Sequence, residues 1–206
     1  MNKEMTSEAA ETGQAPAGPR SFVASRRARL GILIALVLLV GAVLWIAVGR
    51  TSSSPSSTSN LTGSIVATPI RPVALSESGL ATLARTVGQP IYWAGPRPGY
   101  LYELHRTSNG NVYIRYLPQG VNAGAPGAKY LTVATYPFRG ALPALNNVTT
   151  GRHLSIPRGG VVLVSPTYDK SVHLAYPNVN YQVEVYSPTS GTALSLAQSG
   201  QVQPAG

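Results

Sequence analysis

The chain has 206 residues, no cysteine, and a formal net charge of +9 from 16 basic and 7 acidic side chains. The missing thiols exclude disulfides, zinc sites built on thiolates, iron–sulfur clusters and cysteine nucleophiles. Most of the positive charge lies in residues 51–206, which hold ten basic and four acidic side chains.

The N-terminal part of the chain predicts a membrane anchor. Residues 1–29 are polar and lack apolar periodicity, so we expect a disordered tail. Leu30–Val48 then runs without a charged or polar side chain. At about 1.5 Å of rise per residue, this run spans roughly the 30 Å of a bilayer's hydrocarbon core. The sequence therefore predicts a transmembrane helix over residues 30–49.

The basic residues beside this run predict its orientation. Four arginines lie close before it, at Arg20, Arg26, Arg27 and Arg29, whereas Arg50 is the only basic residue between the run and Arg71. The positive-inside rule then puts residues 1–29 in the cytoplasm and the C-terminal domain outside a plasma membrane, as a single-pass signal anchor.

Two alternatives to a retained anchor stay open. Ala47-Val48-Gly49 offers small residues to a signal peptidase, although the apolar run exceeds the usual length of a signal peptide. A buried helix of a soluble domain is the other, but such helices usually keep a polar stripe.

The rest of the chain divides into three parts. Residues 50–72 are rich in Ser, Thr and Pro and predict a flexible stalk. Residues 73–190 form the predicted extracytoplasmic domain. Residues 191–206 contain no aromatic or charged side chain, so we expect a flexible tail.

The domain begins with a helical pattern and continues with alternating ones. Ser76 is the expected N-cap of a helix that runs to about Val87, and Gly88 provides its stop. After Pro90 the apolar period changes to two, which indicates strands. A short helical turn is expected at 141–147. The expected strands are 91–94, 100–107, 111–117, 130–136, 153–156, 161–164, 171–176 and 181–186.

Asn109-Gly110 predicts a β-hairpin between the second and third of these strands. A two-residue turn there would pair Arg106 with Tyr113 and Leu104 with Arg115. One helix followed by six to eight strands favours an α+β fold, a small antiparallel sheet with one packed helix. A small β-sandwich is the alternative.

The candidate binding residues gather around the segment Tyr92–Tyr100. Its two glycines and two prolines fix a tight connection, and Tyr92, Trp93 and Tyr100 surround Arg97. Such a loop is suited to stacking on a sugar or a partner side chain, with the arginine binding an anion. Together with Arg115, these are the predicted ligand contacts. The alternative is a rigid connection whose aromatic rings fill the edge of the core.

The sequence shows no catalytic motif. The domain offers the carboxylates Glu77, Glu103, Asp169 and Glu184 and the histidines His105, His153 and His173. No Gly-x-Ser-x-Gly elbow accompanies them, and the histidines lack metal-type spacing. We therefore expect no catalytic residue, no metal and no cofactor.

The scattered positive charge suggests two classes of partner besides the lipid bilayer. An envelope protein or an anionic envelope polymer would suit it. Nucleic acid is a weaker prediction because no RNA-binding motif is present. A generally solvated basic surface is the alternative.

Four segments carry a resemblance to known proteins: Tyr92–Pro96, Gly99–Leu104, Val112–Pro118 and Tyr130–Pro137. Their pattern resembles that of uncharacterised single-pass membrane proteins of actinobacteria. More loosely, the closing segment Val172–Val185 adds a similarity to the extracytoplasmic domain of unknown function found C-terminal to some anti-sigma factors. The resemblance covers roughly residues 75–187. The resemblance implies a topology and no established activity.

Three hypotheses about function follow. The first is a membrane-anchored domain that binds a ligand or partner in the cell envelope. The second is an enzyme acting on envelope material, which would need a cleft that joins two of the carboxylates Glu103, Asp169 and Glu184 with a histidine. The third is a structural or sensory subunit of a membrane complex.

Overall fold

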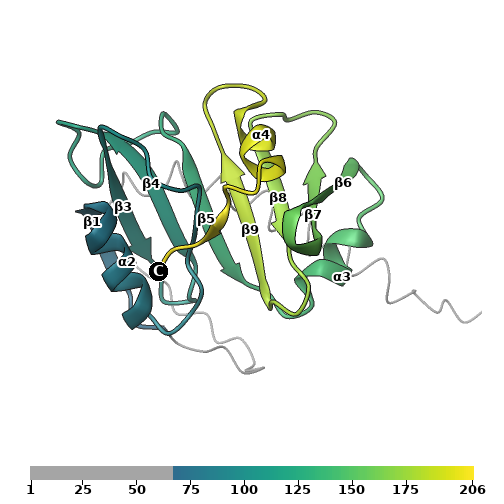
Figure 1. Cartoon of the computed structure of the whole chain (residues 1–206), viewed down its shortest axis with the longest axis horizontal. Coiled ribbons are helices and arrows are strands. Elements are labelled where there is room, and N and C mark those ends of the chain that lie inside the picture. The colour runs from purple at the N-terminus through teal and green to yellow at the C-terminus, as the bar shows by residue number, and fades with distance from the viewer. Residues whose placement is uncertain (1–66) are drawn as a thin grey trace, which may run out of the picture.

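The computed structural model describes residues 67–206. The predicted cytoplasmic tail, the predicted transmembrane helix and most of the predicted stalk lie outside these residues. None of the helices within 67–206 is both long enough and apolar enough to cross a membrane. Figure 1 shows the described part as one broad sheet with helices packed against it.

The strands largely follow the predicted segments. Ten strands and three α-helices are described, together with one short 3₁₀ turn, η1, at Pro157–Gly159. The strands are β1 (Ile70–Leu75), β2 (Tyr92–Trp93), β3 (Tyr100–Arg106), β4 (Val112–Pro118), β5 (Thr132–Pro137), β6 (Arg152–Ile156), β7 (Gly160–Val164), β8 (Ser171–Ala175), β9 (Tyr181–Tyr186) and β10 (Gln203–Pro204). The helices are α2 (Glu77–Thr86), α3 (Ala141–Asn146) and α4 (Thr192–Gln198).

Helix α2 begins and ends as its sequence predicts. The Ser76 side chain accepts a hydrogen bond from the Gly79 backbone N–H at 3.2 Å, which satisfies one free donor of the first turn. Gly88 follows the helix at a φ of 73°, a conformation that glycine adopts without a steric cost. Leu80 and Ala84 are the buried residues of the helix, so its inner face packs on the sheet.

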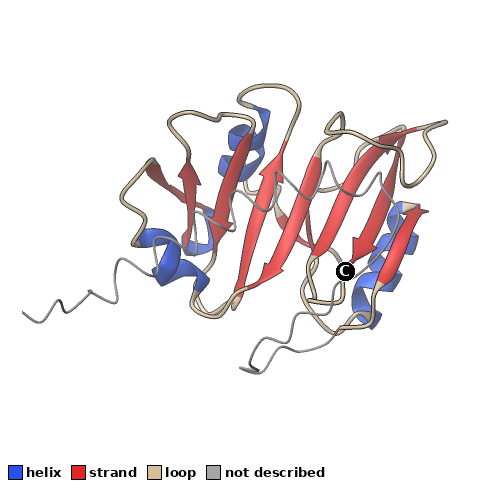
Figure 2. Ribbon diagram, turned by 180° about the vertical axis from the view of Figure 1, so that it is seen from behind, coloured by secondary structure: helices blue, strands red, loops and turns tan. Residues whose placement is uncertain are grey.

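Eight strands form one antiparallel sheet in the order β1-β3-β4-β5-β9-β8-β7-β6. The predicted antiparallel sheet with a packed helix is therefore confirmed; the helical turn expected at 141–147 is α3, and α4 is a further helix that was not predicted. We call the side that carries α2 and α4 the front face and the opposite side, seen in Figure 2, the back face.

The predicted hairpin register is wrong by one residue. Arg106 pairs with Val112, and Glu103, not Leu104, pairs with Arg115. The reason is a three-residue loop in place of a two-residue turn, closed by the Gly110 N–H bond to the Thr107 carbonyl at 3.0 Å. Gly110 has a φ of 83°, as the last residue of such a loop requires. Because side chains alternate along a strand, the shift moves every residue of β4 to the other face relative to β3.

The main core lies between the front face and the elements that cover it. Tyr102, Leu104 and Ile114 of the sheet are buried in one cluster with Leu80 of α2 and Leu196 of α4. The ribbon formed by β2 and β10 lies between the two helices on this face (Figure 1) and is antiparallel. On the back face, α3 packs on one end of the sheet through Leu145 with Leu163 and Ala175.

The predicted flexible tail at 191–206 is contradicted by the structure. Residues 192–198 form α4, and β10 pairs with β2. Val202 is fully buried, and the Ala205 backbone N–H donates to the Ile91 carbonyl at 2.7 Å. Burial against the front face orders a segment whose own sequence carries no aromatic or charged residue, which is why its composition misled the prediction.

The stalk also ends earlier than predicted. Ile70–Leu75 forms the edge strand β1, which pairs with β3 and has a register irregularity between Ile70 and Val73. The backbone N–H of Ala67 already bonds to the Ser108 carbonyl at 3.0 Å. Pro72 lies within β1, where it is tolerated because β1 is the outermost strand of the sheet.

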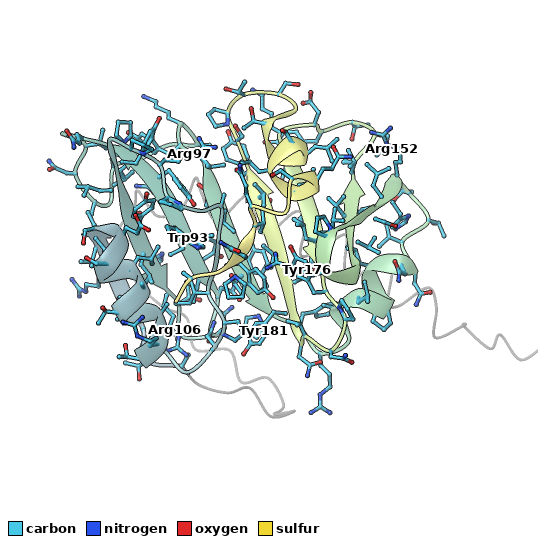
Figure 3. All side chains as sticks on the ribbon, viewed as in Figure 1. Trp93, Arg97, Arg106, Arg152, Tyr176 and Tyr181 are labelled. Atoms are coloured by element: carbon cyan, nitrogen blue, oxygen red, sulfur yellow. The ribbon has the colours of Figure 1, made fainter. Side chains whose placement is uncertain are left out.

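The ends of the strands, with the loops that join them, form two opposite sides of the sheet. We call these the lower edge and the upper edge after their places in Figure 1, as distinct from the edge strands β1 and β6. The chain enters the described part at the lower edge, where Ile70 pairs with Arg106. Figure 3 shows Arg106 at the lower edge and Arg97 at the upper edge. The lower edge comprises residues 67–71, 85–91, 106–112, 137–141, 156–160 and 175–181. The upper edge comprises residues 75–78, 96–101, 117–131, 149–152, 164–171 and 186–191.

Candidate functional site

Two of the predicted contact residues, Tyr92 and Trp93, lie in the core. Tyr92 is 4% exposed and stacks on Tyr176 at 5.5 Å between ring centroids. Trp93 is 8% exposed and meets the Tyr102 ring edge-on at 5.3 Å. Little of either ring faces solvent, so their placement matches the alternative in which the aromatics of this segment fill the edge of the core.

The loop after β2 is held by buried tyrosine hydroxyls. Tyr116 accepts a hydrogen bond from the Ala94 N–H at 2.7 Å and donates to the Gly95 carbonyl at 3.0 Å. Burial raises the pKa of Tyr116, so its hydroxyl stays protonated and able to donate. The Tyr102 hydroxyl accepts from the Arg97 N–H at 2.7 Å. The backbone of this loop is therefore held by hydrogen bonds to two tyrosine hydroxyls of the sheet, at Ala94, Gly95 and Arg97.

Arg97 and Tyr100, at the upper edge, both contact the ring of Tyr116. The guanidinium carbon of Arg97 is 5.6 Å from the centroid of the Tyr116 ring. Tyr100 meets the same ring edge-on at 6.5 Å and is 38% exposed. Arg97 is partly exposed and is flanked by Pro96 and Pro98, which restrict its backbone. A cation and an aromatic ring thus both contact the same buried tyrosine, on a loop with little conformational freedom.

Arg115 does not join the other four predicted residues, because it lies on the back face. Its Nε is 2.8 Å from Glu103 Oε1, and its Nη2 is 2.8 Å from Glu103 Oε2. Both side chains are buried, and this is the one salt bridge among residues 67–206. Arg115 Nη1 also donates to the Ala125 carbonyl at 2.7 Å, and the Gly124 N–H donates to Glu103 at 2.6 Å. The pair thereby holds the loop 119–131 against the sheet.

The back face also carries a polar cluster around Glu184, which the strand pattern alone did not bring together. Its carboxylate accepts from the Tyr136 hydroxyl at 2.7 Å and from the Ser171 hydroxyl at 2.5 Å. His173 pairs with Glu184 in the strand register, and its Nδ1 lies 2.9 Å from Gln182 Nε2. Alternation within β9 would place 182 and 184 on one face, but the pairing of β9 with β5 is not visible in the sequence.

Burial dominates the protonation behaviour of this face. Burial lowers the pKa of His173, and the nearby Glu184 carboxylate opposes that shift. Burial also raises the pKa of Tyr136 well above its ordinary value, with a further increase from Glu184. The cluster therefore favours a neutral imidazole and a protonated phenol at neutral pH.

The residues that the enzyme hypothesis needs are partly separated. Glu103 and Glu184 share the back face, but three strand spacings lie between β3 and β9, about 14 Å. Asp169 lies in the upper-edge loop between β7 and β8, where it accepts a hydrogen bond from Ser190. Of the histidines, His105 stacks on Tyr113 at 6.0 Å, and His153 contacts the Leu145 carbonyl. Within residues 67–206, no three His, Asp or Glu side chains gather as a metal site would require.

Comparisons of the chain with protein-family models, with curated proteins and with solved structures find no match. The candidate site is therefore argued from its geometry alone.

Proposed function

We propose that the chain is a single-pass membrane protein whose outer domain binds another protein of the cell envelope through Arg97 and Tyr100. The apolar run Leu30–Val48 supports the anchor, and the basic residues before it support the orientation. The main observation in favour of this binding site is that Arg97 and Tyr100 both contact the Tyr116 ring.

This arrangement suits a protein interface for two reasons. Tyrosine and arginine are enriched among the few residues that dominate binding energy. A side chain that is already ordered in the free protein loses less entropy on binding, and the two prolines and the tyrosine hydroxyls order this loop. The partly exposed guanidinium would select a partner with a carboxylate beside an apolar contact for the Tyr100 ring.

The test replaces Tyr100 with a photo-crosslinking phenylalanine analogue in the full chain, in its native membrane. Tyr168, another exposed tyrosine of the upper edge, takes the same analogue as the matched control. We expect a single protein adduct from position 100, which Arg97→Ala removes and which position 168 does not form. Hot-spot residues contribute about 2 kcal/mol or more, so the loss of Arg97 should weaken binding about thirtyfold.

Three outcomes would contradict the proposed site. Position 100 could give no adduct, it could give the same adducts as position 168, or its adduct could be unaffected by Arg97→Ala. An adduct with a carbohydrate or phosphate polymer would show instead that an anionic envelope polymer is the ligand.

A further inference from the structure

The charges of the domain are distributed unevenly between its two edges. The lower edge carries five basic residues and no aspartate or glutamate, whereas the upper edge carries four basic residues and two acidic ones. The lower-edge residues are Arg71, Arg85, Arg106, Arg139 and Arg158. The upper-edge residues are Arg97, Lys129, Arg152 and Lys170, with Glu77 and Asp169.

Three of the lower-edge arginines present exposed guanidinium groups, of which Arg85 also donates a hydrogen bond to the exposed Thr82 hydroxyl of its own helix at 3.3 Å. Arg71, Arg85 and Arg139 are exposed, and none of them has a carboxylate partner among residues 67–206. The other two have internal roles: Arg106 donates to Gln89, and Arg158 donates to the Val202 carbonyl. Arg71 and Arg139 lie three strand spacings apart along the edge, about 14 Å, so the exposed charge covers a broad area.

The lower edge is also the edge at which the chain arrives from the predicted anchor. Twenty residues lie between Gly49 and Ile70. A flexible chain of that length spans about 25 Å on average and about 70 Å at most. A bilayer that holds residues 30–49 therefore keeps the domain close to its surface, and the edge joined to the tether is the one best placed to meet it.

We propose that the lower edge rests on the anionic headgroups of the membrane that holds the chain, with Arg71, Arg85 and Arg139 as the contacts. This inference rests on the proposed anchoring of the chain. Phosphate groups of lipids attract exposed arginines at a membrane surface, and each adds about fivefold to the binding constant. In this orientation, the Arg97–Tyr100 pair at the upper edge points away from the bilayer, toward a partner.

The test measures which edge lies nearer to the lipid. The full chain is reconstituted into vesicles of phosphatidylcholine, either alone or mixed with phosphatidylglycerol. Because the chain has no cysteine, a single dye is placed through Ser108→Cys at the lower edge or Thr167→Cys at the upper edge. Energy transfer to an acceptor on the lipid headgroups should be higher from position 108 in the phosphatidylglycerol vesicles, and high salt should abolish the difference.

Two charge-matched variants assign the effect to the lower edge. Arg71→Gln, Arg85→Gln and Arg139→Gln together should lower the ratio of docked to undocked domains about a hundredfold. Lys129→Gln, Arg152→Gln and Lys170→Gln remove the same charge from the upper edge and should leave the ratio nearly unchanged. All six side chains are exposed, so both variants should keep the fold, which circular dichroism checks.

The outcomes separate this inference from the anchor on which it rests. A chain that alkaline carbonate washes off the vesicles refutes the anchor and this inference with it. A chain that stays bound, but shows equal transfer from positions 108 and 167 or an equal loss in both variants, refutes only the docking of the lower edge. If added inorganic polyphosphate changes the fluorescence of the dye at position 108 while phosphatidylglycerol has no effect, the ligand of the lower edge is a soluble polyanion and the docking to lipid is refuted.

Discussion

Replacing Arg115 by methionine should destabilise the domain strongly, because it leaves the Glu103 carboxylate buried beside a single neutral donor, the Gly124 N–H. Removing one partner of a buried ion pair typically costs about 3–5 kcal/mol. For a domain of this size, that loss corresponds to a fall of about 10–20 °C in the unfolding temperature. The same change also removes the bond to the Ala125 carbonyl, so the loop 119–131 should detach from the sheet.

The assay is thermal unfolding of the full chain in detergent, followed by near-ultraviolet circular dichroism. Lys129→Met is the matched control, because Lys129 is an exposed basic residue of the same loop and its loss should change stability by less than about 0.5 kcal/mol. The double variant Glu103→Gln with Arg115→Met should be more stable than Arg115→Met alone, since it removes the unpaired charge.

Two results would refute this reasoning about the ion pair. One is a cost below about 1 kcal/mol for Arg115→Met, the value expected of an exposed pair. The other is a double variant that is less stable than Arg115→Met alone. If Arg115 were instead a ligand contact, as its sequence suggested, its loss would abolish binding and leave the unfolding temperature unchanged.

Two further predictions concern the tail and the histidines. Val202→Ala should cost about 2 kcal/mol in urea unfolding, because it removes two methyl groups from a fully buried site; no measurable loss would show that residues 199–206 do not pack in solution. Stability should also fall as the pH drops below about 6.5, because burial lowers the pKa of His173 and His105 and the unfolded chain then binds more protons. Above that pH this contribution should be fully present, and below it the slope should reach up to about 1.4 kcal/mol per pH unit for each histidine. Urea unfolding at a series of pH values measures it, and a slope between pH 5 and 7 that His173→Asn leaves unchanged would contradict the assignment.

Local signals predicted most of the elements. The Ser76 cap and Gly88 bracket α2 because a helix end needs a side-chain acceptor and a residue free to leave the helical conformation. The segments with a period of two end within a residue or two of the observed strands. The reason is that successive side chains of a strand point to opposite faces of the sheet, so the alternation follows the strand itself.

Register and tertiary burial were beyond such signals. A two-residue turn and a three-residue loop that ends in glycine both suit Asn109-Gly110, and the choice decides whether Arg115 opposes Leu104 or Glu103. Because the predicted hairpin register was off by one residue, the sequence did not reveal the buried ion pair between Glu103 and Arg115. The tail was missed for a related reason: Val202 and Leu196 are ordered by the front face they contact, not by their neighbours in the sequence.

The candidate site was predicted in composition and only partly in geometry. The cluster from Tyr92 to Tyr100 is correctly singled out as a tight aromatic connection, but a sequence does not tell which rings turn inward. The structure turns Tyr92 and Trp93 into the core and leaves Tyr100 exposed. The Glu184 cluster depends on the pairing of β9 with β5, which lie far apart in the chain.

The most direct test of the account is the sidedness of the chain in its membrane. Single cysteines at Ser7 and Thr167, introduced into the cysteine-free full chain, are exposed to a membrane-impermeant maleimide. The account predicts that position 167 reacts in intact cells and that position 7 reacts only after lysis. Labelling of position 7 in intact cells, with position 167 protected until lysis, would contradict it.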